Sequence, residues 1–144
     1  MQIRRAHKKD IDIILTIEKA SFQENAFSRK ALSYHIKNNL FLCALIEDRI
    51  AGYICFSPLT RSKKRRIYSI AVDPSFRKKG LGHKLLIEGE NRSKAKEIFL
   101  EVDETNSGAI VLYYRNGFRE FGRYEKYYGD TDAIRMKKII KLFT

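Results

Sequence analysis

The sequence predicts an α/β (α+β) protein with a single mixed, mostly antiparallel sheet of about seven strands and helices on both faces. Short apolar or alternating runs indicate the strands, and segments with apolar residues at helical spacing lie between them. One connection, from residues 67–72 through a helix to residues 98–102, is expected to join parallel strands by a right-handed crossover. Short turns elsewhere favour antiparallel pairs.

The first half of the chain is expected to form three strands and two helices. Residues 1–5 alternate in polarity and predict a strand, and a helix begins at or near Asp10. Ser28 is suited to cap a second helix, because its side-chain oxygen can accept a first-turn N–H. Residues 41–46 and 50–57 predict two strands that the intervening turn joins as a hairpin. The apolar positions of the two helices are Ile11, Ile14, Leu15, Ala20, Ala31, Leu32 and Ile36.

The second half of the chain is expected to alternate between strand and helix and to end in a hairpin. The strand at 67–72 leads into a third helix, where Gly89 costs about 1 kcal/mol relative to alanine and can end the helix early. Gly117 stops a fourth helix at residues 107–115. The remaining strands are expected at residues 98–102, 118–124 and 133–138, the last two as an antiparallel pair.

Length and composition indicate one globular domain, residues 1–144. Hydrophobic residues make up 44% of the chain and aromatic residues 12%, which argues against a disordered protein. No apolar run approaches the roughly 20 residues that cross a bilayer, and no signal peptide opens the chain, so we expect a cytoplasmic protein without membrane contact. Cys43 and Cys55 are expected to be buried, reduced thiols, although a disulfide between neighbouring strands stays open. No cysteine or histidine has the spacing of a metal site, so no metal is expected.

A basic glycine loop joins the strand at 67–72 to the third helix. It reads Arg77-Lys78-Lys79-Gly80-Leu81-Gly82 and is followed by His83. The first-turn N–H groups of a helix have no partner within it, and the helix dipole adds about half a positive charge, so such a junction can bind phosphate. Gly80 and Gly82 would let a ligand's oxygens approach the backbone. The loop lacks the P-loop and dinucleotide-binding patterns. By itself it predicts either a pyrophosphate site or an ordinary helix start in a basic protein.

Further motifs match one known family. Residues 70–74 read Ile-Ala-Val-Asp-Pro and close the strand before the loop, and residues 100–102 read Leu-Glu-Val. Asn106, Ala109, Leu112-Tyr113 and Asn116-Gly117-Phe118 then follow in order. Together with the R-x-x-G-x-G loop, these motifs resemble the GNAT superfamily of N-acetyltransferases.

Other motifs resemble one subgroup of that superfamily, the RimI-type protein N-terminal alanine acetyltransferases. They are Ile17-Glu18, Phe22, Phe27-Ser28, Tyr127-Tyr128 and Asp132-Ala133-Ile134-Arg135-Met136. The resemblance therefore covers nearly the whole chain. An arginine commonly follows Leu-Glu-Val in the subgroup, and Asp103 stands here instead, which puts the peptide specificity in question.

The resemblance implies a GNAT fold, in which the two central parallel strands splay apart, and acetyl-CoA as co-substrate. The pantetheine arm would lie along the strand that ends at Val72, and the pyrophosphate would lie in the glycine loop. Asn106 would bind the pantetheine or phosphate region, or would cap the following helix. The implied cofactor-binding residues are Ile70, Ala71, Val72, Arg77, Lys78, Lys79, Gly80, Leu81, Gly82, His83 and Asn106.

Acetyl transfer to an amine requires removal of a proton from the amine, stabilisation of an oxyanion and protonation of the departing thiolate. The resemblance implies Glu101 as the general base; without it, a solvated carboxylate at a strand end is the simpler interpretation. Tyr113 is implied as the acid, with Tyr114 as the competing aromatic residue. A backbone N–H near Val72, where the strand is expected to bend, would stabilise the oxyanion.

The acceptor side is less determined by the sequence. Tyr127 and Tyr128 would line an acceptor tunnel, or would pack as ordinary strand residues. The net charge of +12 indicates polyanionic partners, from coenzyme A to ribosomal RNA. Residues 61–66 hold five cations and are expected in a hairpin loop, which is either solvated or in contact with RNA. No aromatic residue interleaves with this run, which argues against a stacking platform for single strands.

Three functions are compatible with the sequence. The first is transfer of an acetyl group to a protein N-terminal α-amine, with a ribosomal protein among the acceptors. The second is acetylation of a small-molecule amine (a polyamine or an antibiotic) or of a lysine side chain. The third is a non-catalytic basic module that binds RNA or the ribosome. A cationic acceptor favours an acidic groove, to which Asp103, Glu104, Asp130 and Asp132 could contribute.

Overall fold

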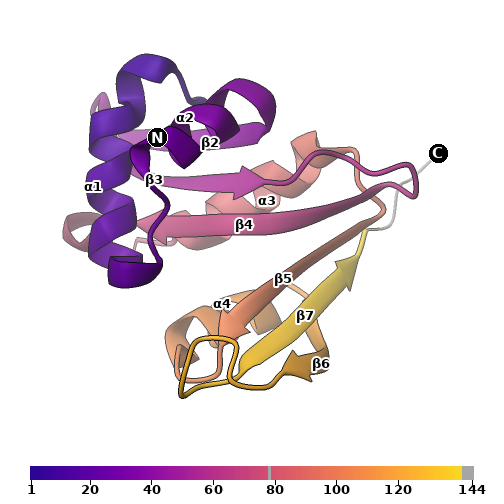
Figure 1. Ribbon diagram of the computed structural model, residues 1–144. Coiled ribbons are helices and arrows are strands. Elements are labelled where there is room, and N and C mark those ends of the chain that lie inside the picture. Colours follow the sequence, from indigo (N-terminus) through magenta and orange to yellow (C-terminus); the bar gives the residue numbers. More distant parts are fainter. Residues whose placement is uncertain (78, 141–144) are drawn as a thin grey trace.

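The computed structural model describes residues 1–77 and 79–140, which form one seven-stranded sheet with helices on both faces (Figure 1). The order of the strands in the sheet is β1-β2-β3-β4-β5-β7-β6. In chain order the elements are β1 (Gln2–Arg5), α1 (Ile11–Phe22), α2 (Arg29–Asn38), β2 (Leu40–Ile46), β3 (Arg49–Phe56), β4 (Lys64–Val72), α3 (Leu81–Ser93), β5 (Glu97–Asp103), α4 (Ser107–Arg115), β6 (Arg119–Tyr124) and β7 (Ala133–Ile139). Single 3-10 turns occupy Lys8–Asp10, Gln23–Asn25 and Pro74–Phe76.

The sheet is antiparallel except at its centre, where β4 and β5 run parallel, as the sequence predicted. Within these described strands the two pair over a short stretch, Lys64–Arg66 against residues 97–99. Beyond it, β4 continues to pair with β3, and β5 continues to pair with β7. The two central strands therefore diverge into a V, which Figure 1 shows between the two halves of the sheet.

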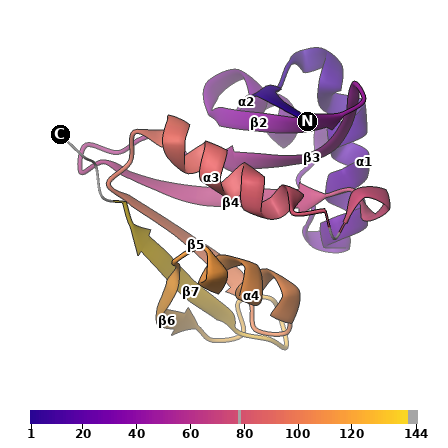
Figure 2. The same ribbon diagram turned by 180° about the vertical axis from the view of Figure 1, so that it is seen from behind.

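Each face of the sheet carries its own apolar core. Helices α1 and α2 cover the N-terminal half on one face, and α3 and α4 lie on the other (Figure 2). The α1 side buries Ile14, Ile17 and Leu32, and the α3 side buries Leu85 and Leu86 against the strands. Among the described helices none is long and apolar enough to cross a membrane.

Local chemistry explains the element boundaries that the sequence predicted correctly. The side chain of Ser28 accepts a hydrogen bond from the Ala31 N–H at 3.1 Å and so caps α2. Glu47 and Asp48 both have positive φ, which gives the two-residue turn between β2 and β3 the twist that a hairpin requires.

Cys43 and Cys55 are free and buried within these strands, and desolvation raises the pKa of the Cys43 thiol to about 12.

Two expectations about local structure were wrong. Gly89 does not end α3, which continues to Ser93, because tertiary packing requires a glycine there. A Cβ at Gly89 would lie 2.6 Å from Phe56 Cζ, so the missing side chain makes room for the aromatic ring. Ala20, expected on the buried side of the first helix, is exposed.

The basic run at residues 61–66 is also not a loop throughout. Strand β4 already begins at Lys64, because Arg65 and Arg66 have partners on opposite faces of the sheet. Arg65 Nε donates to the Ser93 carbonyl at 2.8 Å, and its Nη1 donates to the Ser57 carbonyl at 2.9 Å. The first three residues of the run form the turn that precedes the strand.

Candidate active site

The gap between β4 and β5 is the main structural feature of the candidate site. The register between β3 and β4 skips one residue, because Cys55 lies opposite Ser69 and Phe56 lies opposite Ile67. Tyr68 is therefore the extra residue of a β-bulge, just after the last pair that joins β4 to β5. The sequence placed the bend near Val72, which instead pairs in register with β3. That expectation was wrong, since a bulge depends on the pairing of two strands.

Glu18 of α1 holds the bulge in place. Its buried carboxylate accepts hydrogen bonds from the Ser69 hydroxyl at 2.8 Å, from the Tyr53 hydroxyl and from the Phe27 N–H at 2.8 Å. These contacts join α1, β3, β4 and the segment between α1 and α2. A buried charge of this kind is tolerated because hydrogen bonds replace its lost hydration.

The glycine loop leads into α3 as the sequence predicted, but its two glycines have different roles. Gly80 is the N-cap of α3 and has φ of +74°, a left-handed conformation that favours glycine. An added Cβ there would meet no heavy atom within 4 Å, so the backbone lies open at the start of the helix. A Cβ at Gly82 would instead lie 3.0 Å from Leu112 Cδ2, so this glycine lets α3 pack closely against α4.

The remaining loop residues differ in what they can offer a ligand. Arg77 is exposed, and its Nε donates to the Val72 carbonyl at 3.3 Å. Leu81 is buried, so its backbone N–H rather than its side chain is available, and His83 is exposed in the first helical turn. Lys79 is exposed, and its ammonium lies 5.7 Å from the centre of the Phe76 ring. The predicted ligand Lys78 lies outside the described residues.

Asn106 caps α4, with its side-chain oxygen accepting the Ala109 N–H at 3.2 Å. The capping role that the sequence allowed is therefore present.

Glu101 lies on β5 where the strand has left β4, and it is buried rather than solvated. Its side chain is 4% exposed, and Oε1 lies 2.5 Å from Arg66 Nη2. Across the β5–β7 pair, Arg135 Nε lies 4.0 Å from Oε2. The interpretation of Glu101 as a solvated carboxylate at a strand end is thus wrong.

The two tyrosines of α4 have different environments. Tyr113 is buried and packs edge to face against Phe118, with ring centres 5.9 Å apart. Desolvation raises the pKa of Tyr113 above its ordinary value of 10, and the nearby Tyr128 adds to the shift. Tyr114 is exposed and lies under the Arg119 guanidinium, 3.9 Å from the ring centre. Of the two, Tyr113 is the one enclosed by the fold.

The segment between β6 and β7 carries Tyr127 and Tyr128 and is a loop, not a strand. The Tyr128 hydroxyl donates to the main-chain carbonyl of Glu101 at 3.4 Å, and desolvation raises the pKa of Tyr128 to about 12. The Tyr127 hydroxyl accepts a hydrogen bond from Arg66 Nη2 at 3.4 Å. Both tyrosines therefore lie beside Glu101, and Tyr128 also contributes to the raised pKa of Tyr113.

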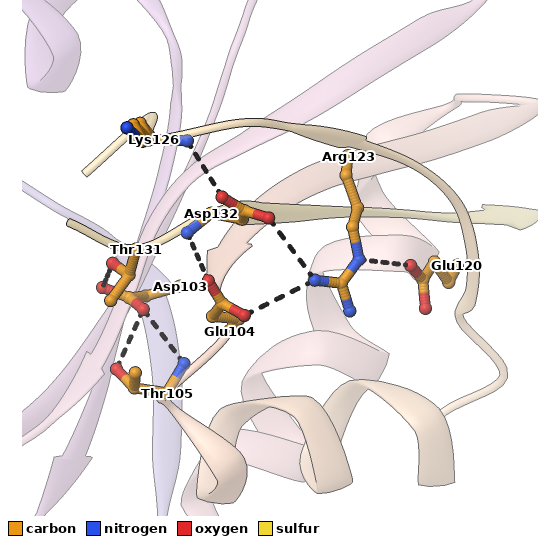
Figure 3. Close-up of polar contacts among 8 residues, drawn as sticks. All are labelled: Asp103, Glu104, Thr105, Glu120, Arg123, Lys126, Thr131 and Asp132. Carbon is orange, nitrogen blue, oxygen red and sulfur yellow. Dashed lines mark hydrogen bonds and ion pairs between the residues drawn. The ribbon is translucent and has the colours of Figure 1, made fainter. Parts of the chain in front are cut away.

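A polar network fixes this loop against the end of β5 (Figure 3). Asp132 Oδ1 accepts the Lys126 N–H at 2.9 Å, and Glu104 Oε2 accepts the Asp132 N–H at 2.5 Å. Arg123 bridges the two carboxylates, with its Nη1 3.5 Å from Glu104 and 3.7 Å from Asp132.

Asp103 lies beside this network and is bonded to two threonines, as Figure 3 shows. It accepts hydrogen bonds from the Thr105 hydroxyl at 2.8 Å and from the Thr131 hydroxyl at 3.0 Å. Desolvation opposes ionisation, but these hydrogen bonds outweigh it and hold the pKa of Asp103 below its ordinary value. The carboxylates of Asp103, Glu104 and Asp132 are thus occupied by the protein's own donors.

A family model described as "Acetyltransferase (GNAT) family" matches residues 11–118. The chain belongs to this family. An N-alpha-acetyltransferase of Sulfolobus acidocaldarius is 36% identical, with 94% of this chain and 90% of that protein covered. Among solved structures, the ribosomal-protein-S18-alanine N-acetyltransferase of Escherichia coli has a TM-score of 0.87 at 24% identity, covering 99% of this chain and 96% of that one. PaiA N-acetyltransferase of Thermoplasma acidophilum, solved with coenzyme A, has a TM-score of 0.82 at 21% identity, with 96% and 98% covered.

The protein is thus an N-acetyltransferase with a GNAT fold, and the V between β4 and β5 is the splay that the resemblance implied. Within residues 1–77 and 79–140, no group of three or more His, Cys, Asp or Glu side chains is placed to hold a metal ion.

Two residues of the candidate site, Arg66 and Arg135, were not predicted from the sequence. In the sequence Arg66 belongs to a basic run and Arg135 to a family motif, and neither pattern indicates a contact with Glu101. The alternation of β4 and β7 could have placed both on the face of Glu101, but only if the strand register had been known.

Proposed function

We propose that this protein transfers the acetyl group of acetyl-CoA to the α-amine of a protein N-terminus. The observation that carries the proposal is the buried Glu101 carboxylate at the opening between β4 and β5, beneath a loop of aromatic residues. Aromatic walls suit an extended peptide end, and the 36% identical relative is named an N-alpha-acetyltransferase. A ribosomal protein is a candidate acceptor, because the Escherichia coli neighbour is named for that activity.

The described residues fit the co-substrate. The open backbone at Gly80 and the first-turn N–H groups of α3 offer donors to a diphosphate, with Arg77 and Lys79 nearby. Within the described strands, the edge of β4 at Ile70, Ala71 and Val72 faces the gap and can hydrogen-bond the pantetheine amides. When bound there, acetyl-CoA supplies an activated thioester.

The chain's own residues would then perform the proton transfers. An α-amine has a pKa of about 7.7–8.0, so a carboxylate such as Glu101 suffices to remove its proton, directly or through a water. Tyr113 has a raised pKa and is protonated at neutral pH, so its hydroxyl can donate to the leaving sulfur. The backbone N–H groups at the Tyr68 bulge are candidates for the oxyanion site, since a bulge interrupts regular pairing.

The two alternatives have less support. A polyamine, an antibiotic amine or a lysine side chain is cationic, and three of the four carboxylates that could attract it, those of Asp103, Glu104 and Asp132, are bonded within the protein (Figure 3). Arg66 and Arg135 face the same opening and would repel amines of higher pKa, such as a lysine side chain, more than an α-amine, which loses its proton at about pH 7.8. A purely RNA-binding module would give no reason to bury Glu101 beside the gap.

Purified protein with acetyl-CoA, offered a panel of peptides and free polyamines, tests the proposal. Acetylation of peptide α-amines, located by mass spectrometry on the first residue, is the expected result. Peptides with a blocked α-amine and a free lysine are the matched control and should not react. Turnover of spermidine without turnover of peptides would refute the proposal, and RNA binding without affinity for acetyl-CoA would support the non-catalytic module.

A further inference from the structure

Two arginines share the single carboxylate of Glu101, and this leaves hydrogen-bonding capacity unused in a buried place. The side chain of Glu101 is 4% exposed, whereas the side chains of Arg66 and Arg135 are 35% and 27% exposed. Glu101 Oε2, Arg66 Nε and Arg135 Nε are buried, and none of the three has a hydrogen-bond partner among the described residues. Buried polar atoms are normally paired, so these three atoms leave the group of side chains around Glu101 with unused hydrogen-bonding capacity.

The charge around Glu101 has an excess of cations. Strand pairing places Lys64 and Arg66 of β4, and Arg135 and Lys137 of β7, on the face that carries Glu101. Glu97 lies on the same face, 3.5 Å from Lys64 Nζ and 4.0 Å from Lys137 Nζ. Four cations thus surround two carboxylates. In Figure 1, α1 and α2 lie over β2–β4 and leave this face of β5 and β7 without a covering helix among the described residues.

The cations on β7 are oriented by aromatic rings. The Arg135 guanidinium lies 4.6 Å from the centre of Phe121 and 4.4 Å from the centre of Tyr124, and Lys137 Nζ lies 5.1 Å from Phe121. A guanidinium whose face packs on a ring keeps its edge of N–H groups free for a carboxylate. A hollow of about 230 Å³ lies here, lined by Lys64, Glu97, Phe99, Phe121, Arg135 and Lys137.

We propose that Arg66, Arg135 and Lys137 form an anion-binding subsite beside Glu101. This subsite would select acceptors with an acidic residue, Asp or Glu, at the second or third position of the N-terminus. The inference rests on the proposed function. An extended peptide advances about 3.3 Å per residue, so a side chain one or two residues beyond an amine held at Glu101 reaches the flanking arginines. The incoming carboxylate would pair with the exposed parts of these side chains, which are 35% exposed in Arg66, 27% in Arg135 and 42% in Lys137, and would reduce the excess positive charge.

The test compares peptides that differ at one position. Three peptides carry Glu, Gln or Lys at the second residue, a second set carries the same changes at the third, and kcat/KM is measured for each with saturating acetyl-CoA. We expect the Glu peptide to exceed the Gln peptide by about tenfold in at least one set, mainly through KM, because a charge-assisted hydrogen bond replaces a neutral one. The Lys peptide should be the poorest.

Two variants locate the effect. R135Q should reduce the Glu-to-Gln ratio to about one, whereas R115Q, which removes the same charge from the exposed end of α4, should keep it. If R135Q does not fold, K137Q and the salt dependence of the wild type replace it. The ratio should fall between 0.1 M and 1 M salt, since the screening length shortens from about 10 Å to about 3 Å.

The outcomes separate the two proposals. Equal kcat/KM for all peptides, or a Glu-to-Gln ratio that R135Q leaves unchanged, would refute the anion-binding subsite. Neither result would contradict N-terminal acetylation. Failure to acetylate any peptide α-amine would overturn the proposed function itself, and the subsite with it.

Discussion

Glutamine in place of Glu101 keeps the size of the side chain and one acceptor oxygen but removes its charge. Arg66, whose Nη2 lies 2.5 Å from the carboxylate, then loses its counter-ion. Loss of one partner from a fully buried pair costs about 3–5 kcal/mol. Because Arg66 and Arg135 are 35% and 27% exposed, solvent screens the remaining charges, and we expect a loss of stability of about 1–2 kcal/mol.

The effect of E101Q on the rate should be larger and should depend on pH. A general base contributes about 10²–10⁴-fold, and we expect kcat/KM for a peptide to fall about 100-fold at pH 7, or about 2.7 kcal/mol. An α-amine with a pKa of about 7.8 is roughly one-seventh unprotonated at pH 7 and almost fully so at pH 9. The deficit of the variant should therefore narrow by about sevenfold over that range.

The assay is release of free thiol from acetyl-CoA between pH 6.5 and 9.5, with folding checked by circular dichroism. E90Q is the matched control, because the Glu90 side chain is 15% exposed and lies 2.9 Å from Lys138 Nζ, away from the gap. It should lose comparable stability and keep its turnover. If the kcat/KM of E101Q equals that of the wild type at pH 7, Glu101 is not the base. The same follows if the ratio of wild-type to E101Q kcat/KM is equal at pH 7 and pH 9.

Three further outcomes follow from the same geometry. Y113F should lower kcat about 10–100-fold with little change in KM, and an unchanged kcat would contradict the role of Tyr113 as the acid. Because burial raises the pKa of Tyr113 above 10, wild-type activity should not decline through loss of its proton below about pH 10. G89A should be destabilised by about 1 kcal/mol and lose about 3 °C in Tm, because overpacking against Phe56 exceeds the gain in helix propensity; a Tm at or above wild type contradicts this. G80A should lose about 1 kcal/mol, because of its φ of +74°, and should bind coenzyme A more weakly by calorimetry, whereas an unaltered Kd would argue against the loop as the diphosphate site.

Tertiary contacts overruled local signals at several positions. Gly89 is unfavourable for a helix by propensity, yet α3 continues through it because the ring of Phe56 occupies the space of a side chain. The charge of residues 64–66 suggests a loop, but Arg65 and Arg66 find carbonyl and carboxylate partners on opposite faces of the sheet. Apart from Ser57, these partners come from distant parts of the chain, so no local pattern could have shown them.

The sequence by itself determined the order and type of the elements, the cap at Ser28, the strand–glycine–helix junction and the family, because these depend on periodicity and on motifs within a few residues. Only the tertiary structure decided that the strand irregularity lies at Tyr68 and that Gly82 serves packing. It alone decided that Glu101 lies buried between Arg66 and Arg135. The physical reason is register, because one residue of shift between paired strands moves every side chain to the other face, and nothing within a single strand records the choice of partner.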